Sequence, residues 1–345
     1  MKYTTIPNTD IKVSKICLGT MTFGEQNSEA EGHEQMDYAL ANGVNFFDTA
    51  ELYSVPARAE TYGATEKIIG TWLKKTGNRD KVVIASKIAG AGPYTAHIRS
   101  NGFAKEALIS AVEGSLQRLQ TDYIDLYQLH WPERGVNCFG LRDYPYQTAA
   151  KEAENHLEIL ETLKDLKKQG KIRSIGLSNE TPWGTMKYLQ TAKDHDLPRM
   201  STIQNSYSLI HRAYEYGMSE VSLREDIGLL VYSPLGFGVL SGKYLNGQMP
   251  EDSRVKLFPN YNRYSSPQSE KAVSAYQKIA EKHGMTLAEM SLAFINQLPF
   301  VTSNIIGASK MSQLKENIGS IHIDLSEEII SEINHVHALM PNPAP

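Results

Sequence analysis

The sequence predicts an α/β protein built as a (β/α)8 TIM barrel, with an N-terminal β-hairpin and long βα loops. Eight short runs rich in apolar and β-branched residues recur along the 345-residue chain, with helical patterns between them. The runs are nearly continuous in apolar residues, as parallel strands covered by helices are. Such alternation fits a doubly wound open sheet or a barrel. Eight units without a low-complexity linker favour the barrel.

The expected elements follow in chain order. A hairpin is predicted over residues 3–15, where an Asn-Thr-Asp turn joins two alternating stretches. The eight barrel strands are then expected at residues 15–20, 44–50, 81–87, 123–130, 174–179, 202–207, 228–235 and 304–308. Between them, apolar residues recur every three or four positions over 103–120 and again over 156–166. Gly170 is a natural end for the second of these helices.

Three connections are longer than packing requires, at residues 88–103, 131–155 and 236–270, and all three follow strands. Loops that follow the strands of a barrel meet at its C-terminal face, where active sites of this fold lie. We therefore expect these loops to wall a pocket. The whole chain, residues 1–345, is expected to form a single domain.

Composition narrows the class of protein. The net charge of −4 and pI near 6.2 argue against nucleic acid or an anionic membrane as the main partner. No apolar run is long enough to cross a bilayer, and the first residues lack a signal-peptide core. Cys17 and Cys138 lie far apart, which favours a reducing compartment over a disulfide framework. A cytoplasmic location is expected.

Polar residues end three consecutive strands. The second strand ends at Asp48, with Tyr53 five positions later, the third at Lys87 and the fourth at His130. Each has an ordinary structural explanation when taken alone, such as a helix cap, a solvated strand end or a structural histidine. Because neighbouring barrel strands deliver their ends to one rim, the four together predict a catalytic site.

Their chemistry fits carbonyl reduction. An ordinary tyrosine has a pKa near ~10 and transfers protons poorly at neutral pH, and a neighbouring ammonium favours its phenolate. A carboxylate can hold the ammonium in place, and an imidazole can donate a hydrogen bond to a carbonyl oxygen. Side chains supply no hydride, so this chemistry requires a cofactor.

Two segments are candidates for binding that cofactor. No GxGxxG motif follows the first strand, but the Gly-rich loop at residues 233–244 follows the seventh. Its backbone N–H groups, with Lys243, can cradle a pyrophosphate. After the eighth strand, Ser309 and Lys310 begin a helix, which is a second possible anion site.

Seven motifs carry a resemblance to a known family: NFFDTAELY, IASK, LYQLHWP, GLSNE, IQNSYSL, YSPLGFGVLSGKY and IIGASKMSQLKENI. In this order and spacing they resemble the aldo-keto reductase superfamily over almost the whole chain. Residues 18–53 are similar to the bacterial Tas-like aldo-keto reductases. The resemblance implies a barrel that binds NADP(H), preferred over NAD(H), without a Rossmann domain.

The same resemblance implies roles for individual residues. It makes Asp48, Tyr53, Lys87 and His130 a catalytic tetrad with Tyr53 as the general acid and base. Besides Asp48, the cofactor residues that it implies are Thr20, Met21, Ser178, Asn179, Gln204, Tyr232, Ser233, Leu235, Gly236, Gly238, Ser241, Lys243, Gly307, Ser309, Gln313, Glu316 and Asn317.

Two features bear on the ligands. Aromatic residues near and within the long loops predict an apolar pocket, and Phe23, Trp131 and Tyr144 are the substrate candidates among a set that also includes Tyr94, Phe139 and Tyr146. Many NADPH-specific relatives carry cations where this chain has Ala308 and Gln313. The cofactor 2′-phosphate would then rely on Ser309, Lys310 and an arginine, either Arg254 or Arg263.

The leading hypothesis is an NADPH-dependent reductase of aldehydes or ketones, with a small carbonyl compound as its partner and no metal. The alternative is a cofactor-sensing or regulatory protein on the same barrel, with little turnover. A metal- or phosphate-dependent hydrolase lacks ligands at the strand ends, since the only HxH pair, His335 and His337, lies near the C-terminus. The substrate, the direction of reaction and the oligomeric state are not determined by the sequence.

Overall fold

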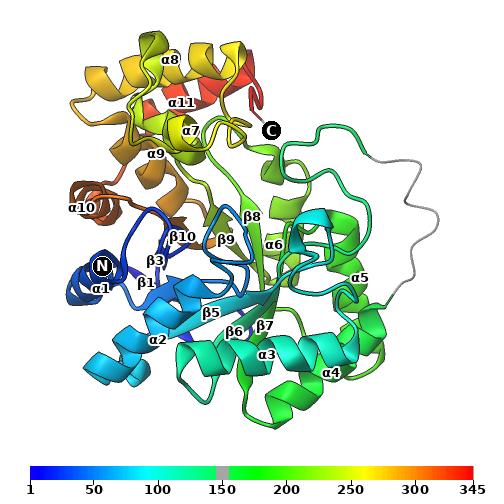
Figure 1. The fold of residues 1–345 in the computed structure, drawn as a ribbon. Helices are drawn as coiled ribbons and strands as arrows, with labels where there is room; N and C mark the ends of the chain where they lie inside the picture. The colour runs from blue at the N-terminus through cyan, green and yellow to red at the C-terminus, as the bar shows by residue number, and fades with distance from the viewer. Residues whose placement is uncertain (145–154, 345) are drawn as a thin grey trace.

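The structure is a computed structural model that describes residues 1–144 and 155–344, without the side chain of Tyr94. Eight parallel strands form a closed barrel in the order β10-β3-β4-β5-β6-β7-β8-β9, which confirms the predicted fold (Figure 1). The strands are β3 (Ile16–Gly19), β4 (Phe46–Asp48), β5 (Val83–Ile88), β6 (Ile124–Leu129), β7 (Ile172–Ser178), β8 (Thr202–Ser206), β9 (Gly228–Tyr232) and β10 (Val301–Ile306).

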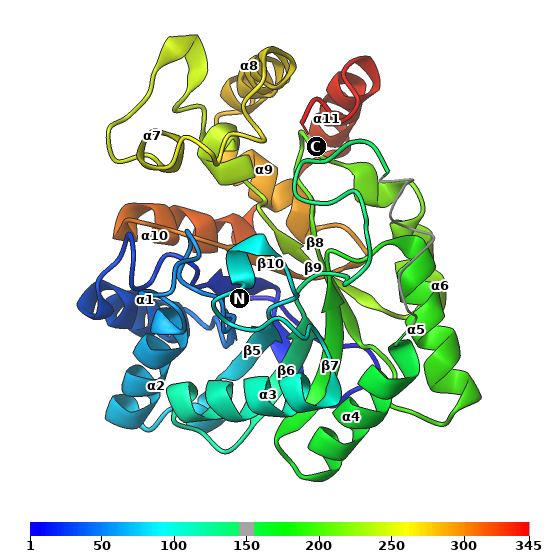
Figure 2. The same ribbon diagram turned by 45° about the vertical axis from the view of Figure 1, so that its right-hand side comes forward.

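Helices surround the barrel, and α8, α9 and α11 lie together at the top of both views (Figures 1 and 2). They are α1 (Glu29–Ala41), α2 (Ala64–Thr76), α3 (Lys105–Leu119), α4 (His156–Lys168), α5 (Pro182–Asp194), α6 (Met218–Glu225), α7 (Arg254–Leu257), α8 (Pro267–Lys282), α9 (Leu287–Asn296), α10 (Met311–Gly319) and α11 (Glu327–Leu339). Within the described ranges, none of these helices has the length and apolar character to span a bilayer.

The N-terminal hairpin covers one end of the barrel. Its strands β1 (Tyr3–Thr5) and β2 (Lys12–Ser14) pair antiparallel, as predicted. Ile6, Ile11 and Val13 of the hairpin share a buried cluster with inward-facing residues of the barrel such as Phe46 and Leu126. A separate, larger cluster fills the space between the strands and the surrounding helices. The hairpin therefore closes the N-terminal end of the barrel, and the C-terminal end stays open for an active site.

Strand register brings the polar strand ends together. Asp48 pairs with Ala85 of β5, so Lys87 lies two residues further along the neighbouring strand and on the same face. Lys87 in turn pairs with Gln128 of β6, and Ser178 of β7 pairs with Gln204 of β8. The register thus places an acid, an amine and two amides at one end of the barrel.

The barrel strands differ from their predicted bounds by up to three residues at their ends, and two of them differ by three residues at one end. The strand predicted over 228–235 ends at Tyr232, because Ser233 has a positive φ of 54° that takes the chain out of the ladder. The strand predicted over 304–308 begins earlier, at Val301, and its register to β9 shifts between Val301 and Ser303. Both changes leave the loops after these strands at the C-terminal end of the barrel.

Candidate active site

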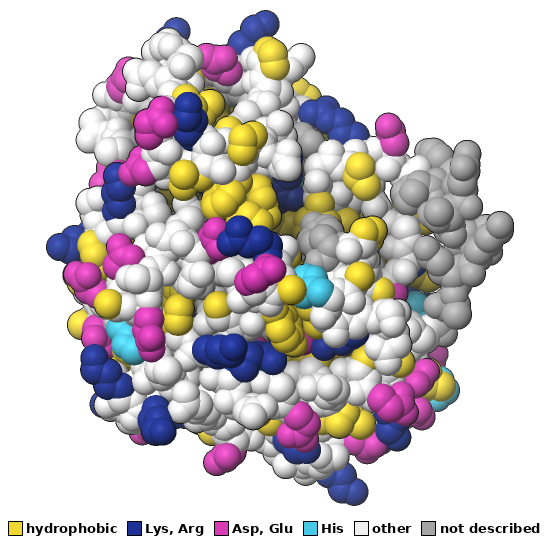
Figure 3. Space-filling model, viewed as in Figure 1, with side chains coloured by type: hydrophobic (Ala, Val, Ile, Leu, Met, Phe, Trp, Pro, Cys, Tyr) yellow, Lys and Arg dark blue, Asp and Glu magenta, His cyan; other side chains and the backbone are white. Residues whose placement is uncertain are grey.

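A cavity of about 650 Å³ opens at the C-terminal ends of the strands. Residues 19–26, 52–57, 130–139, 232–263 and 305–317 supply most of its walls. Figure 3 shows hydrophobic side chains gathered in a hollow of this face, below α7. The cavity is therefore built mainly from segments that follow strands, as expected for this fold.

A buried ion pair forms the floor of the site. The Nζ atom of Lys87 donates to Asp48 Oδ2 at 2.7 Å and to the carbonyl oxygen of Thr49 at 2.8 Å. The other carboxylate oxygen of Asp48 accepts from Gln204 Nε2 at 2.8 Å. Burial alone would lower the pKa of Lys87, but Asp48 and Tyr53 raise it above its usual value. Lys87 is therefore held as a cation.

Tyr53 lies between Lys87 and His130. Its ring centroid is 4.9 Å from Lys87 Nζ and 5.7 Å from the centroid of the His130 ring. Tyr53 is only 8% exposed and lines the cavity. Burial raises the pKa of Tyr53, and Lys87 opposes that rise without reversing it. The phenol is thus fully protonated at neutral pH and can act as a proton donor.

His130 reaches the cavity as a neutral imidazole. Burial lowers the pKa of His130 well below its usual value, and the charge of Lys87 adds to this effect. A neutral imidazole carries one N–H and can donate a single hydrogen bond. The Nδ1 atom of His130 is buried and has no hydrogen-bond partner among the described residues.

A second buried carboxylate fastens the segment that carries Tyr53. Glu51 Oε1 accepts from the backbone N–H of Ala89 at 2.6 Å, and Arg99 Nη2 donates to Glu51 Oε2 at 2.7 Å. These bonds tie the segment after β4 to the loop after β5. Glu51 and Arg99 were not predicted. Glu51 lies in the same DTAELY motif as Tyr53, so an acid directly after a buried strand was the available signal.

Amide and hydroxyl groups line the cavity next to His130. Asn179 Nδ2 donates to the backbone oxygen of His130 at 2.8 Å, and the hydroxyl of Tyr232 donates to Asn179 Oδ1 at 2.6 Å. Ser178 Oγ donates to the backbone oxygen of Gln204 at 2.8 Å. The structure therefore brings together four of the predicted cofactor residues, Ser178, Asn179, Gln204 and Tyr232.

Cations gather at the loop after β9. Gly238 has a φ of +89°, and a Cβ at that position would lie 2.8 Å from Lys243 Cε, so only glycine lets Lys243 fold against this loop. Burial lowers the pKa of Lys243, and the charge of Arg254 lowers it further. Burial also lowers the pKa of Arg254. The two cations lie near one another, so this part of the cavity favours an anion.

The residues after β10 pair mostly with one another. Gln313 Oε1 accepts from the backbone N–H of Ser309 at 3.0 Å, and Asn317 Nδ2 donates to the oxygen of Gly307 at 3.2 Å. Lys310, which was expected to meet a phosphate, instead forms an ion pair of 2.5 Å with Asp252. Lys310 is therefore already neutralised in this structure.

Most of the predicted site residues meet at the cavity. Asp48, Tyr53 and His130 line it, and Lys87 lies directly behind Asp48 with no exposed surface. All of the predicted cofactor residues line it except Gly236, which lies in the same loop. Trp131 also lines the cavity, and its ring is 4.9 Å from that of His130.

Two of the predicted substrate residues and one of the three long loops do not line the cavity. Phe23 is fully buried in the hydrophobic core, where its ring packs beside Gly32, and it does not line the cavity. Tyr144 is 41% exposed and lies outside the cavity walls. The loop at residues 88–103 supplies Arg99 to the Glu51 ion pair but no cavity wall, while the other two long loops do. The side chain of Tyr94 and all of Tyr146 lie outside the described residues.

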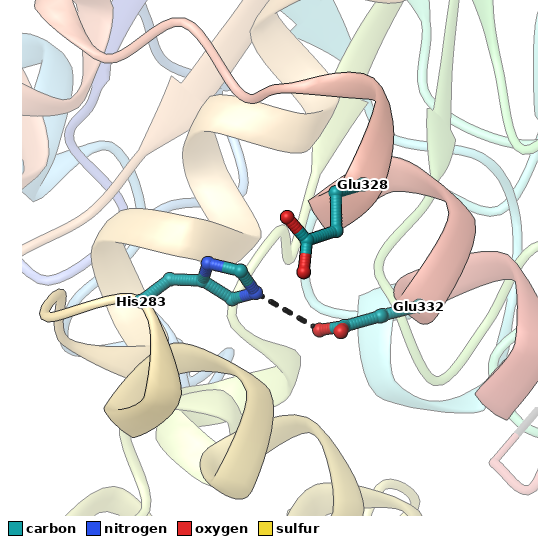
Figure 4. Close-up of side chains that lie close together, drawn as sticks. All are labelled: His283, Glu328 and Glu332. Carbon is teal, nitrogen blue, oxygen red and sulfur yellow. Dashed lines mark hydrogen bonds and ion pairs between the residues drawn. The ribbon is translucent and has the colours of Figure 1, made fainter.

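One group of possible metal ligands lies elsewhere. His283, at the end of α8, faces Glu328 and Glu332 of α11, with His283 Nε2 3.0 Å from Glu332 Oε2 (Figure 4). Lys282 Nζ already lies 2.9 Å from Glu328 and 2.5 Å from Glu332. Because the lysine supplies the positive charge that the two carboxylates need, the group is explained as a surface ion-pair network.

Comparison with known proteins agrees with this geometry. The model of the "Aldo/keto reductase family" matches residues 15–338. The chain is 50% identical to Protein tas of Escherichia coli, with full coverage of both chains. It is 33% identical to the Bacillus subtilis protein named uncharacterized oxidoreductase YrpG, over 97% of this chain and 96% of that one. It is 28% identical to norsolorinic acid reductase B of Dothistroma septosporum, over 95% and 79% respectively. The chain therefore belongs to the aldo/keto reductase family and is an NAD(P)H-dependent oxidoreductase.

Proposed function

We propose that the protein reduces aldehydes or ketones to alcohols with NADPH, and that Tyr53 donates the proton. One observation carries this proposal: the Tyr53 phenol lines the cavity between the ammonium of Lys87 and the neutral imidazole of His130. A bound reduced nicotinamide supplies the hydride. The residues present fit that group, because the Asn179 amide lies beside His130 and cations line another part of the cavity.

The catalytic residues orient the carbonyl group, donate the proton and stabilise the charge that develops. His130 donates a hydrogen bond to the carbonyl oxygen and holds it beside the Tyr53 hydroxyl, which polarises the carbonyl. Tyr53 then releases its proton to that oxygen. Lys87 stabilises the negative charge that develops on the Tyr53 oxygen, and Asp48 holds Lys87 in place at 2.7 Å. Leu52, Val55 and Trp131 line the cavity with apolar surface and exclude water.

The rate of reduction is expected to stay level between about pH 6.5 and pH 10. Tyr53 keeps its proton over this range, because burial raises its pKa above the usual 10.0. His130 stays neutral, because burial lowers its pKa well below 6.5. Measuring kcat/KM for a neutral aldehyde across this range checks the prediction. A step in kcat/KM centred near pH 7 would show that one of the two groups titrates there and would contradict its assignment.

The preference for NADPH follows from the cations of the cavity. We propose that Arg254 and Lys243 bind phosphate groups of the cofactor, with the Ser309–Gln313 pair at the adenosine end. Lys310 is paired with Asp252, so it does not supply a free charge. Arg254 has no carboxylate within 4 Å among the described residues, and it therefore becomes the candidate for the 2′-phosphate.

Replacing Arg254 by glutamine should raise the KM for NADPH about 10-fold or more, since a charge-assisted hydrogen bond is lost. The KM for NADH should change little, because NADH lacks the 2′-phosphate. Steady-state kinetics with both cofactors and one aldehyde measure the two values. An equal rise in both would instead assign Arg254 to the pyrophosphate, which the two cofactors share.

A further inference from the structure

We propose that Arg263 forms an anion-binding subsite of the substrate pocket. The preferred substrates are then carbonyl compounds that carry a carboxylate on an aromatic or apolar body. This inference rests on the proposed reductase function and adds to it the chemical class of the substrate.

Most arginines of this protein are paired with a carboxylate. Nine of the twelve arginines have a carboxylate oxygen within 4 Å. In the part of the chain that the structure describes, the three without one are Arg142, Arg254 and Arg263. Arg142 is exposed and lies outside the cavity walls, whereas the other two line the cavity. A partly buried guanidinium without a counterion is unfavourable unless an anion joins it from outside the chain.

The two cavity arginines differ in their surroundings. Arg254 lies near Lys243, and these two cations suit the several charges of a dinucleotide. Arg254 also lies 5.3 Å from the ring centroid of Phe237, but Arg263 is framed by three rings, those of Tyr232, Phe237 and Tyr264. The guanidinium carbon of Arg263 lies 5.6 Å from the ring centroid of Tyr232 and 5.2 Å from that of Phe237. A single guanidinium framed by rings suits one carboxylate on an apolar molecule.

Arg263 lies close to the proposed reacting centre. Tyr232, over which its guanidinium lies, donates to Asn179, and Asn179 donates to the backbone of His130. Arg263 is therefore linked through Tyr232 and Asn179 to the segment that carries His130. A carboxylate bound there shares the cavity with a carbonyl held at Tyr53.

The loop after β6 meets Arg263 from the other side. A Cβ built on Gly140 would lie 3.3 Å from the Cβ of Arg263, so the two backbones approach closely. Phe139, next to Gly140, lines the cavity with its ring 6.0 Å from that of Trp131. An aromatic or apolar substrate thus has rings on this wall of the cavity and a cation at its edge.

Arg263 also keeps hydrogen-bonding capacity. Its Nη2 atom donates to the hydroxyl of Tyr264 at 2.6 Å, and its Nε is buried without a partner among the described residues. A guanidinium has five N–H donors, and a carboxylate takes two of them in a bidentate pair. Packing of Arg263 against the rings would hold the loop, but it would leave the charge and the Nε donor unmatched.

The test compares two aldehydes of matched shape, para-carboxybenzaldehyde and the methyl ester of that acid. In the wild-type enzyme the acid should have a kcat/KM about 10- to 100-fold above that of the ester, as expected for a buried charge-assisted pair. Arg263→Met should bring the ratio to about one or below, with the KM for NADPH unchanged. Arg263→Lys should keep part of the preference, because it keeps the charge and loses the bidentate geometry.

Two control variants separate the roles of the arginines. Arg142→Met, at an exposed position outside the cavity, should leave the ratio and both KM values as in the wild type. Arg254→Gln should raise the KM for NADPH and leave the ratio of acid to ester unchanged. A ratio near one in the wild type, or an unchanged ratio in Arg263→Met, would overturn the proposal.

Binding measurements keep the proposal testable if replacement of Arg263 loosens the loop or if no aldehyde is reduced. Calorimetry with the NADPH-loaded protein should show benzoate binding about 10-fold or more tightly than benzamide in the wild type, and no such difference in Arg263→Met. Failure of the wild type to reduce even the neutral ester would reject the proposed function. Equal binding of benzoate and benzamide to the wild type would reject the anion subsite by itself.

Discussion

Replacement of Tyr53 by phenylalanine should lower kcat/KM for carbonyl reduction by roughly 10²- to 10⁴-fold, the usual contribution of a general acid. The substitution removes only the hydroxyl. The ring keeps its place among Leu52, Ala50 and Ala89, with which it forms a small buried cluster. Affinity for NADPH should therefore stay within about 2-fold of the wild type, because the cations proposed to bind the cofactor are unchanged. Steady-state kinetics and a fluorescence titration with NADPH measure the two quantities.

Tyr216→Phe is a matched control, since Tyr216 is 67% exposed and lies outside the cavity. It should behave as the wild type in both measurements. Turnover that survives unchanged in Tyr53→Phe would remove Tyr53 as the proton donor. Loss of NADPH binding together with turnover would show instead that Tyr53 supports the shape of the cavity.

Replacement of Lys87 by methionine should have the second large effect, and on stability as well as on activity. Lys87 is fully buried and its ammonium is the ion-pair partner of Asp48. Removing it leaves a buried carboxylate without a counterion, which costs about 3–5 kcal/mol of the free energy of unfolding. Turnover should fall as well, because nothing then stabilises the charge on the Tyr53 oxygen. Urea denaturation measures the stability.

The double variant Asp48→Asn/Lys87→Met separates charge from packing. With the carboxylate gone, part of the lost stability should return, although turnover should stay low. Lys193→Met, at an exposed position on α5, should change the free energy of unfolding by no more than about 0.5 kcal/mol. A stability of Lys87→Met equal to that of Lys193→Met would show that the Asp48–Lys87 pair contributes nothing to the fold.

The barrel could be predicted because the sequence patterns of the strands and helices alternate in the order that the barrel topology requires. Each strand of the barrel is a short apolar run, and the intervening helices show a helical period, as in α3 and α4. Gly170 ends the predicted helix with a φ of +76°, as a C-terminal glycine should. The errors lie at strand ends. The positive φ of Ser233 and the register shift before Ser303 depend on contacts between strands, and a single run of residues does not encode them.

The tetrad was predictable for a related reason. Once three consecutive strands are assigned, their polar ends must meet, and the register then fixes Asp48 beside Lys87. The residues that line the substrate side of the cavity were harder to predict from the sequence. Phe23 and Trp131 are both aromatic residues that follow a strand, yet Phe23 turns into the core and Trp131 into the cavity. That difference is set by neighbours distant in sequence, such as Ile68 beside Phe23.

Ion pairs between residues far apart in the chain could not be predicted from the sequence either. Glu51 and Arg99 are 48 positions apart, and Lys310 and Asp252 come from separate loops. Sequence reasoning therefore offered Arg254 and Arg263 as interchangeable partners for a phosphate. The structure distinguishes them, because Arg254 lies near Lys243, whereas Arg263 is framed by the rings of Tyr232, Phe237 and Tyr264.

The most direct test of the reductase mechanism follows the hydride itself. The protein is mixed with an aromatic aldehyde and NADPH that carries deuterium at the transferable position of the nicotinamide C4, and the alcohol is analysed by mass spectrometry. The account predicts one deuterium on the carbinol carbon of each alcohol molecule, and a much lower yield with Tyr53→Phe. Tight binding of NADPH without labelled alcohol from any aldehyde or ketone would contradict the account and favour a cofactor-sensing protein.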